Sequence, residues 1–303
     1  MNILVTGVGG QLGHDVMDEL ARRGHSATGA DIALNQNAVW PYVPMDITDA
    51  GAVRRVLLEM KPDGVVHCAA WTAVDLAEEP ENARKVRDIN VVGTRNIAEA
   101  CRELDARMLY ISTDYVFDGQ GDEPWQPDCR DYRPLNVYGR SKLEGERAVG
   151  GILEKYFIVR TAWVFGLNGK NFVRAMLDAG KKHGRVRVVD DQIGTPTYAR
   201  DLARLLVDMM ETERYGYYHA TNAEEAEGGY ISWCAFTREI YRQAGYTTEV
   251  VPVSTAEYGL SRAARPHNSR LDKTKLAAMG FKPLPTWKDA LSRYLKEINY
   301  GTD

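Results

Sequence analysis

The sequence has few cysteines and lacks the long apolar runs that mark membrane proteins. Its four cysteines, Cys68, Cys101, Cys129 and Cys234, are widely spaced and form no Cys-x-x-Cys pair. We therefore expect reduced, mostly packed thiols rather than a disulfide or zinc framework. No apolar run approaches membrane-spanning length, and we find no repeat and no low-complexity segment.

An excess of charge of one sign is also absent. The chain has 38 Lys and Arg against 42 Asp and Glu, a formal net charge of -4, and no Lys/Arg run suggests nucleic acid or a membrane surface as partner. The first apolar strand pattern begins at Asn2, which leaves no room for a signal peptide, so we expect a cytoplasmic protein. With 303 residues and 44% hydrophobic content, one large domain or two coupled ones are expected.

The N-terminal residues have the pattern of a phosphate-binding turn. An apolar strand at residues 2–7 precedes Gly7, Gly10 and Gly13, and an amphipathic helix runs from about Gln11 to Arg23. The first glycine permits a tight turn, the second lets the backbone approach a pyrophosphate, and the third lets the helix pack close to the strand. The spacing differs from the usual G-x-G-x-x-G, and a plain strand-to-helix turn is the alternative.

An acidic residue follows the next predicted strand at the distance expected for a ribose-binding carboxylate. Residues 25–30 form this strand, and Asp31 ends it. Such a residue binds the adenosine ribose hydroxyls and favours NAD over NADP. An aspartate that caps the next turn is the alternative, and the sequence leaves both interpretations open.

Strand and helix patterns alternate through the first half of the chain. Strands are predicted at residues 2–7, 25–30, 65–70 and 109–113, with helices at residues 11–23, 50–61 and 81–104 between them. This alternation predicts an α/β fold with a doubly wound, Rossmann-like parallel sheet and helices on both faces. Ligands bind beyond the carboxyl ends of such strands, where Gly7, Asp31, Ala70 and Thr113 lie. His67 lies within an apolar run, so we predict a core histidine.

The residues from Leu109 to Glu146 predict an acid–base site. An apolar strand ends at Thr113, and a helix follows in which Tyr138 and Lys142 lie four residues apart on one face. A nearby ammonium favours the phenolate and lowers the pKa of a tyrosine, which then serves as a proton donor. The alternative is a packed tyrosine and a surface lysine paired with Glu146.

The second half of the chain predicts a smaller C-terminal α/β lobe. Residues 117–137 form a loop long enough to suggest a functional flap, and a strand at residues 157–166 offers Trp163 as an aromatic wall. Arg262, Arg265 and Arg270 either meet a phosphorylated substrate or are ordinary surface arginines. We assign residues 1–163 and 190–215 to the dinucleotide-binding domain and residues 164–189 and 216–303 to the substrate lobe.

Together these motifs resemble a known family. The Thr-Gly-x-x-Gly-x-x-Gly opening and Tyr138-x-x-x-Lys142 resemble the extended short-chain dehydrogenase/reductase superfamily. Within it, the chain resembles the dTDP-4-dehydrorhamnose reductases over nearly its whole length. The stretches that carry this resemblance are Ser-Thr-Asp-Tyr-Val-Phe-Asp-Gly at 112–119, Tyr-Gly-x-Ser-Lys-Leu-x-Gly-Glu at 138–146, Asp-Gln-x-Gly-x-Pro-Thr-Tyr at 191–198 and Arg-Pro-x-Asn-Ser at 265–269.

The resemblance implies that NADPH or NADH reduces the 4-keto group of dTDP-4-dehydro-L-rhamnose. Tyr138 would donate the proton, Lys142 would lower the pKa of Tyr138 and hold the nicotinamide ribose, and Thr113 would position the keto oxygen. The implied cofactor-binding residues are Gly7, Gly10, Gln11, Leu12, Gly13, Asp31, Asp46, Ile47, Ala69, Ala70, Trp71, Ile111, Tyr138 and Lys142. The substrate-binding residues that we predict are Thr113, Asp114, Trp163 and Arg265.

Two residues narrow this interpretation, and two alternatives to it stay open. Similar sugar-nucleotide dehydratases carry a glutamate where this chain has Tyr115, which argues against dehydration. Some members of the family dimerise through a metal held by carboxylates, but Asp15 stands where a glutamate is expected, and we predict no metal. We expect a monomer or homodimer. The alternatives are a reductase of another deoxysugar nucleotide and a regulatory protein like the regulatory subunit of methionine adenosyltransferase.

Overall fold

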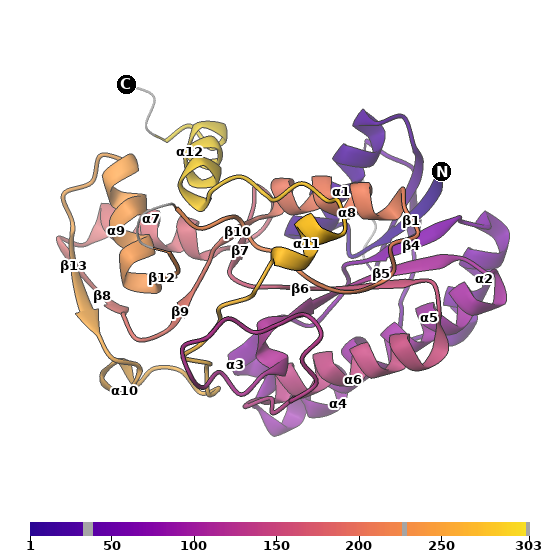
Figure 1. Cartoon of the computed structure of the whole chain (residues 1–303), viewed down its shortest axis with the longest axis horizontal. Coiled ribbons are helices and arrows are strands. Elements are labelled where there is room, and N and C mark those ends of the chain that lie inside the picture. The colour runs from indigo at the N-terminus through magenta and orange to yellow at the C-terminus, as the bar shows by residue number, and fades with distance from the viewer. Residues whose placement is uncertain (33–38, 226–228, 301–303) are drawn as a thin grey trace.

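The computed structural model describes residues 1–32, 39–225 and 229–300. Its centre is a sheet of seven strands in the order β11-β6-β5-β4-β1-β2-β3 (Figure 1). Every neighbouring pair in this sheet is parallel, so all carboxyl ends meet at one edge. The strands are β1 (Asn2–Thr6), β2 (Ser26–Asp31), β3 (Tyr42–Pro44), β4 (Gly64–His67), β5 (Arg107–Thr113), β6 (Tyr156–Thr161) and β11 (Gly216–His219).

Helices cover both faces of the sheet, which confirms the predicted doubly wound fold. Figure 1 shows α1 (Gln11–Arg22) and α8 (Ala199–Met210) on one face, and α2 (Ala50–Met60), α5 (Thr94–Glu103) and α6 (Val137–Ile152) on the other. The strands are buried on both sides: Ile3 and Val5 pack toward α1 and α8, and Leu4 packs toward α2 and α5. None of the helices in the described ranges combines the length and the apolar character needed to cross a membrane.

A second, smaller set of elements packs at one end of the sheet (Figure 1). Its helices enclose their own core, in which Phe165, Phe236 and Tyr294 are buried. Three short strand pairs join them: β7 with β10, β9 with β12, and β8 with β13. The elements are β7 (Val164–Phe165), α7 (Phe172–Lys182), β8 (Arg185–Val189), β9 (Ile193–Gly194), β10 (Thr197–Tyr198), β12 (Ile231–Ser232), α9 (Trp233–Gln243), β13 (Glu249–Val253), α10 (Thr255–Tyr258) and α12 (Trp287–Glu297). The remaining helix of the C-terminal half, α11 (Thr274–Ala278), packs against the central sheet.

Two predicted elements are interrupted in the structure. The helix predicted at 81–104 consists of a 3₁₀ turn, α4 (Ala83–Arg87), a π-helical segment (Asp88–Gly93) and α5. The strand predicted at 157–166 breaks into β6 and β7 at Trp163, whose φ of 53° lies in the left-handed region. For a bulky residue this conformation costs about 1–3 kcal/mol, so the surrounding packing has to hold it.

The domain boundary that we predicted near residue 215 does not match the extent of the central sheet. Residues 216–219, which we assigned to the substrate lobe, form β11 at the edge of the central sheet, beside β6. Leu276, Phe281 and Leu284 also pack into the core on the α1 and α8 face. Because these residues follow a long excursion of the chain, their pairing with the sheet is a tertiary property that local patterns do not carry.

The loop predicted as a flap is fastened to the C-terminal region. Trp125 forms a parallel bridge with Leu271, and its ring stacks on Phe117 with centroids 4.5 Å apart. The amide of Asn268 donates to the carbonyl oxygens of Gln120 (3.3 Å) and Glu123 (2.8 Å). The loop is therefore a packed wall held by residues near 270.

Candidate active site

A cavity of about 940 Å³ lies at the carboxyl edge of the central sheet. All of the predicted site residues except Trp71 and Arg265 line it. These are Gly7, Gly10, Gln11, Leu12, Gly13, Asp31, Asp46, Ile47, Ala69, Ala70, Ile111, Thr113, Asp114, Tyr138, Lys142 and Trp163. The residues come from separate strand ends and meet because the strands are parallel.

The glycine-rich turn has the close approaches that a dinucleotide site requires. Gly7 has a φ of 72°, and a Cβ there would lie 2.6 Å from the backbone nitrogen of Ala69. At Gly13 a Cβ would lie 2.4 Å from the carbonyl oxygen of Gly7. Gly10 begins α1 without any side-chain cap, and the side-chain oxygen of Gln11 is buried without a hydrogen bond. The uncapped N–H groups of this helix suit a diphosphate.

The structure confirms that Asp31 caps the backbone, and its binding to the adenosine ribose stays a prediction. One carboxylate oxygen accepts from the backbone N–H of Gly9 at 2.9 Å, and the other accepts from Ile32 at 2.8 Å. The residue therefore fixes the glycine-rich turn and caps the backbone beyond β2. Its carboxylate also lines the cavity, where ribose hydroxyls of an adenosine would lie.

Three predicted catalytic residues are brought together by close packing of α6 against the end of β5. Thr113 is the last residue of β5, and Asn136 caps α6 by accepting from Gly139 N at 2.7 Å. A Cβ at Gly139 would lie 2.2 Å from the carbonyl oxygen of Tyr115, so only glycine permits this approach. As a result Tyr138 lies beside Thr113, whose hydroxyl interacts with the phenol.

Lys142 is a buried residue and not a surface lysine. Only 3% of it is exposed, and its ammonium lies 4.0 Å from the centre of the Tyr110 ring. Burial lowers the pKa of Lys142 to about 7, although the carboxylate of Glu146 acts in the opposite direction. A lysine in this state carries a charge that responds to pH near neutrality.

The predicted lowering of the Tyr138 pKa is wrong for this structure. Burial raises the pKa of the phenol above its usual range, and the Thr113 hydroxyl offsets this only in part. Lys142 is not among the groups that shift it. The physical reason is that a low-polarity site penalises the phenolate more than the neighbouring groups stabilise it. Tyr138 is therefore a protonated phenol at neutral pH, which is the form of a proton donor.

Asp114 adds a buried carboxyl to the cavity. It is 2% exposed, and Thr113 donates to one of its oxygens at 2.9 Å. The other oxygen is buried and has no hydrogen bond within the described part of the chain. Burial raises the pKa of Asp114 to about 6, while Ser269 and Thr113 lower it. An unpaired oxygen in this wall can accept from, or donate to, a hydroxyl of a bound ligand.

Glu146 pairs with Arg160 inside the protein and does not form a surface pair with Lys142. Both residues are at most 1% exposed, and their shortest contact is 2.7 Å. Ser112 donates to the same carboxylate at 2.6 Å. The guanidinium also donates to the hydroxyl of Tyr132 (2.7 Å) and the carbonyl oxygen of Pro127 (3.3 Å) in the loop that follows β5. This buried network joins β5, β6 and α6 to the loop at residues 117–137.

Trp163 and Trp233 form an aromatic wall at the far side of the cavity. Their ring centroids are 3.7 Å apart, and both residues line the cavity. Trp163 was predicted, but Trp233 was not, because it begins α9 in the second lobe, and no local pattern distinguishes it from a core aromatic residue. The strained backbone of Trp163 and the pair of stacked rings make this wall a candidate ligand surface, and binding of a sugar there stays a prediction.

Two predicted site residues lie outside the cavity wall. The backbone N–H of Trp71 donates to the side chain of Asn90 (2.8 Å), and Asn90 donates back to the carbonyl oxygen of Trp71 (3.1 Å). Arg265 forms a two-bond ion pair with Asp75, with a shortest distance of 2.7 Å. This guanidinium joins the segment after α10 to α3 (Val74–Ala77), and Arg265 is not among the described residues that line the cavity.

The other predicted arginines and His67 also have partners. Arg262 pairs with Glu79, and Arg270 lies 3.7 Å from Asp122. His67 is a core histidine as predicted: it is 1% exposed, and burial lowers its pKa to about 3. The four cysteines are free.

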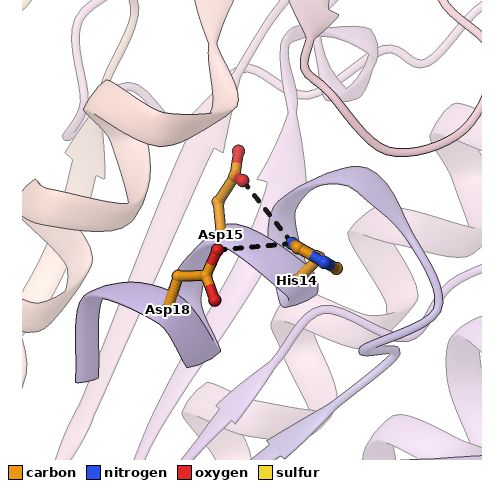
Figure 2. A group of neighbouring side chains, drawn as sticks. All are labelled: His14, Asp15 and Asp18. Atoms are coloured by element: carbon orange, nitrogen blue, oxygen red, sulfur yellow. Dashed lines mark ion pairs between the residues drawn. The ribbon is translucent and has the colours of Figure 1, made fainter. Parts of the chain in front are cut away.

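One group of imidazole and carboxylate side chains lies in α1. Figure 2 shows the Nδ1 atom of His14 between Asp15 and Asp18, at 3.8 Å and 3.7 Å from their nearest oxygens. Asp15 raises the pKa of His14, and burial raises the pKa of Asp15. The three ligand atoms lie within 4.8 Å of one another. We interpret the group as ion pairs within one helix, and the absence of a metal stays a prediction.

Comparison with known proteins decides the family. The family model described as "RmlD substrate binding domain" matches residues 1–300. The chain belongs to this family. A dTDP-4-dehydrorhamnose reductase from Streptomyces griseus is 41% identical over 95% of this chain and 91% of its own length. The crystal structure of a dTDP-4-dehydrorhamnose reductase from Bacillus anthracis, in complex with NADP, is 38% identical, covers 98% of this chain and 99% of its own, and has a TM-score of 0.89.

A further relative, which also matches nearly the whole chain, has a different name. It is the dTDP-4-keto-6-deoxy-D-glucose reductase of Streptomyces niveus, 34% identical over 98% of this chain and 97% of its own length. The resemblance inferred from the motifs is therefore confirmed at the level of the RmlD family.

Proposed function

We propose that this protein is an NADPH- or NADH-dependent reductase that converts dTDP-4-dehydro-L-rhamnose to dTDP-L-rhamnose. The observation that carries the proposal is the convergence of Thr113, Tyr138 and Lys142 on one cavity with a glycine-rich turn. The relatives named dTDP-4-dehydrorhamnose reductase, one of them solved with NADP, support it.

Different residues of the chain have different roles in the proposed reduction. The reduced nicotinamide supplies the hydride. The glycine-rich turn and the N-terminus of α1 hold the diphosphate of the cofactor, and Lys142 holds the nicotinamide ribose near Tyr138. Tyr138 gives the proton of its phenol to the carbonyl oxygen, and the Thr113 hydroxyl positions that oxygen by hydrogen bonding. Asp114 and Trp163 border the sugar.

Tyr115 supports reduction without dehydration. It lines the cavity and meets Tyr138 edge to face, with ring centroids 5.8 Å apart. Burial raises the pKa of the Tyr115 phenol above its usual range. Such a phenol stays protonated at neutral pH, so it cannot serve as the base that removal of water from a sugar requires.

A second candidate is a reductase of another 4-keto deoxysugar nucleotide. The relative from Streptomyces niveus named dTDP-4-keto-6-deoxy-D-glucose reductase favours it. The wall formed by Trp163 and Trp233, which both line the cavity, would distinguish the two sugars.

The test follows oxidation of NADPH or NADH by its near-ultraviolet absorbance in the presence of each sugar nucleotide. We expect oxidation that depends on dTDP-4-dehydro-L-rhamnose and is slower with dTDP-4-keto-6-deoxy-D-glucose. The opposite ranking would favour the second candidate, and no oxidation with either would contradict both. We also propose a cytoplasmic monomer or homodimer without nucleic-acid or membrane partners, and sedimentation of the purified protein measures the oligomeric state.

A further inference from the structure

The loop between β7 and α7, residues 166–171, lies across the glycine-rich turn. The side-chain amide of Asn168 donates to the carbonyl oxygens of Gly9 at 2.9 Å and Gly10 at 3.1 Å. These two hydrogen bonds tie the loop to the turn that precedes α1. The loop therefore forms a second side of the place where the function proposed above puts the diphosphate of the cofactor.

The same loop is fixed at its base. The amide of Asn171 donates to the carbonyl oxygen of Gly166 at 2.8 Å, and the guanidinium of Arg174 donates to that of Leu167 at 2.9 Å. Gly169 has a φ of 77°, which lets the chain turn sharply at the tip. Hydrogen bonds thus hold both ends of this short loop and leave it little conformational freedom.

This fixed loop ends with Lys170, Asn171 and the start of α7, and Lys170 is exposed. Lys170 lines the same cavity as Gly10 and Gln11. It forms no ion pair with any carboxylate of residues 1–32, 39–225 or 229–300. An unpaired cation beside an uncapped helix N-terminus creates a region of positive potential that suits an anion.

The other cations of the cavity wall have partners of their own. Lys142 is buried over Tyr110. Arg84 lies 3.5 Å from Asp88. Lys85 stands 5.5 Å from the centre of the Trp71 ring. Lys170 is thus the cation of the described wall that is free to meet a phosphate.

We propose that Lys170, positioned by Asn168, binds the diphosphate shared by NADPH and NADH. The N–H groups of α1 contact the diphosphate from one side, and the ammonium contacts it from the other. The inference rests on the proposed function for the presence of a dinucleotide. It adds a residue outside the glycine-rich turn to the cofactor site. Lysine suits this role because its compact charge needs no fixed orientation toward a phosphate.

The first test measures cofactor binding to the full chain without turnover. NADPH and NADH are each titrated into wild type, Lys170→Met and Lys170→Arg, and the Kd is obtained by calorimetry. We expect Lys170→Met to raise the Kd of both nucleotides by about tenfold, the effect of losing one charge-assisted contact. Lys170→Arg should restore most of the affinity. Lys182→Met, at the exposed end of α7, is the matched control and should bind like wild type.

The possible results of this titration distinguish binding of the diphosphate by Lys170 from the alternative roles of this residue. If Lys170→Met leaves the Kd of both nucleotides unchanged, the inference is overturned. The proposed function would still stand in that case, because the wild type binds the nucleotides. A change for NADPH alone would place the lysine at the 2′-phosphate and also overturn it. A change confined to the KM of the sugar nucleotide would overturn it too. Wild type that binds neither nucleotide would contradict the proposed function itself.

A second test asks whether Asn168 acts through Lys170. Asn168→Ala should raise the Kd of both nucleotides, since the loop loses its bonds to Gly9 and Gly10. In the Lys170→Met background the same change should add little, because the group that it positions is already gone. Additive effects of the two substitutions would contradict the positioning role of Asn168. Added salt should weaken binding less steeply in Lys170→Met than in wild type.

Discussion

At the scale of single residues, burial decides the charges around the reacting centre. It raises the pKa of Tyr138 above its usual range and lowers that of Lys142 to about 7. The phenol is then protonated at neutral pH and able to give its proton to a carbonyl oxygen. The lysine changes its charge within the physiological range, so the site should respond to pH through Lys142.

Replacement of the proposed proton donor tests its role. Tyr138→Phe removes only the hydroxyl, so we expect kcat to fall by about a hundredfold to about ten-thousandfold, the usual contribution of a positioned acid. The Kd of NADPH, measured by calorimetry, should stay close to the wild-type value. Turnover that survives this substitution would show that another group supplies the proton.

The pKa of Lys142 predicts how activity depends on pH. The folded pKa lies below the usual value of 10.5, so the ammonium is present below about pH 7 and is lost as the pH rises through that value. We therefore expect kcat/KM, which reports the free enzyme, to fall as the pH rises through about 7. Lys142→Arg should lower the rate but move this fall to higher pH. A profile that stays flat through neutrality would contradict a required ammonium.

The spacing of Tyr138 and Lys142 could be predicted, but their pKa values could not. Four residues of helix place both side chains on one face, which is a local property. Their burial depends on β5, on the Tyr110 ring and on the wall that follows, all of which are tertiary. Asp114 illustrates the same limit, because both the burial that raises its pKa and the effect of Ser269 on that pKa depend on tertiary packing.

At the scale of elements, close packing between backbones positions the site. Gly13 brings α1 against the turn after β1, Gly7 brings this turn against the segment after β4, and Gly139 brings α6 against the turn after β5. In each place a Cβ would lie under 3 Å from a backbone atom, so neither element can move away without shifting the other. The phosphate-binding turn and the catalytic helix therefore depend on glycine for the same physical reason.

A substitution in α1 tests this dependence. Gly13→Ala places a Cβ 2.4 Å from the carbonyl oxygen of Gly7, so we expect binding of NADPH to be lost or strongly weakened. Gly151→Ala in α6, where no atom lies within 4 Å of the added Cβ, is the control. It should bind normally and be more stable by up to about 1 kcal/mol, since alanine favours a helix. Calorimetric titration and thermal unfolding measure both, and equal binding by the two variants would contradict the packing argument.

The regular elements of the central sheet were predictable, and the interruptions were not. Repeated strand and helix patterns indicate a parallel sheet whatever the distant contacts are. Within the π-helical segment at Asp88–Gly93, Asn90 bonds to the backbone of Trp71 and to Ser141. The break at Trp163 accompanies a stack with Trp233, seventy positions later in the chain. Distant partners accompany both features, so local patterns do not reveal them.

At the scale of the whole molecule, a buried ion pair connects β6 and α6 to the loop that follows β5. Glu146 lies on the helix of Tyr138, and Arg160 lies on β6. Through Tyr132 and Pro127 the guanidinium holds the loop that the sequence predicted as a flap. The loop has the length of a flap, but hydrogen bonds and stacked rings fix it to the rest of the chain, while many of its side chains stay exposed.

Breaking this pair should destabilise the protein more than breaking a surface pair. Arg160→Met leaves Glu146 charged and buried, so we expect the free energy of unfolding to fall by about 3–5 kcal/mol. Arg54→Met removes an exposed pair with Glu103 and should cost at most about 1 kcal/mol. Urea unfolding followed by circular dichroism measures both. Similar losses in the two variants would show that the buried pair adds no special stability.

For the whole molecule, we expect that a hydride reaches the 4-keto carbon in this cavity while Tyr138 protonates the carbonyl oxygen. The most direct measurement incubates wild type and Tyr138→Phe with dTDP-4-dehydro-L-rhamnose and NADPH that carries deuterium at the transferable position. Nuclear magnetic resonance of the product then locates the label. The account predicts one deuterium at C4 of dTDP-L-rhamnose with wild type and almost no product with Tyr138→Phe. Label at another carbon, or equal product from the variant, would contradict it.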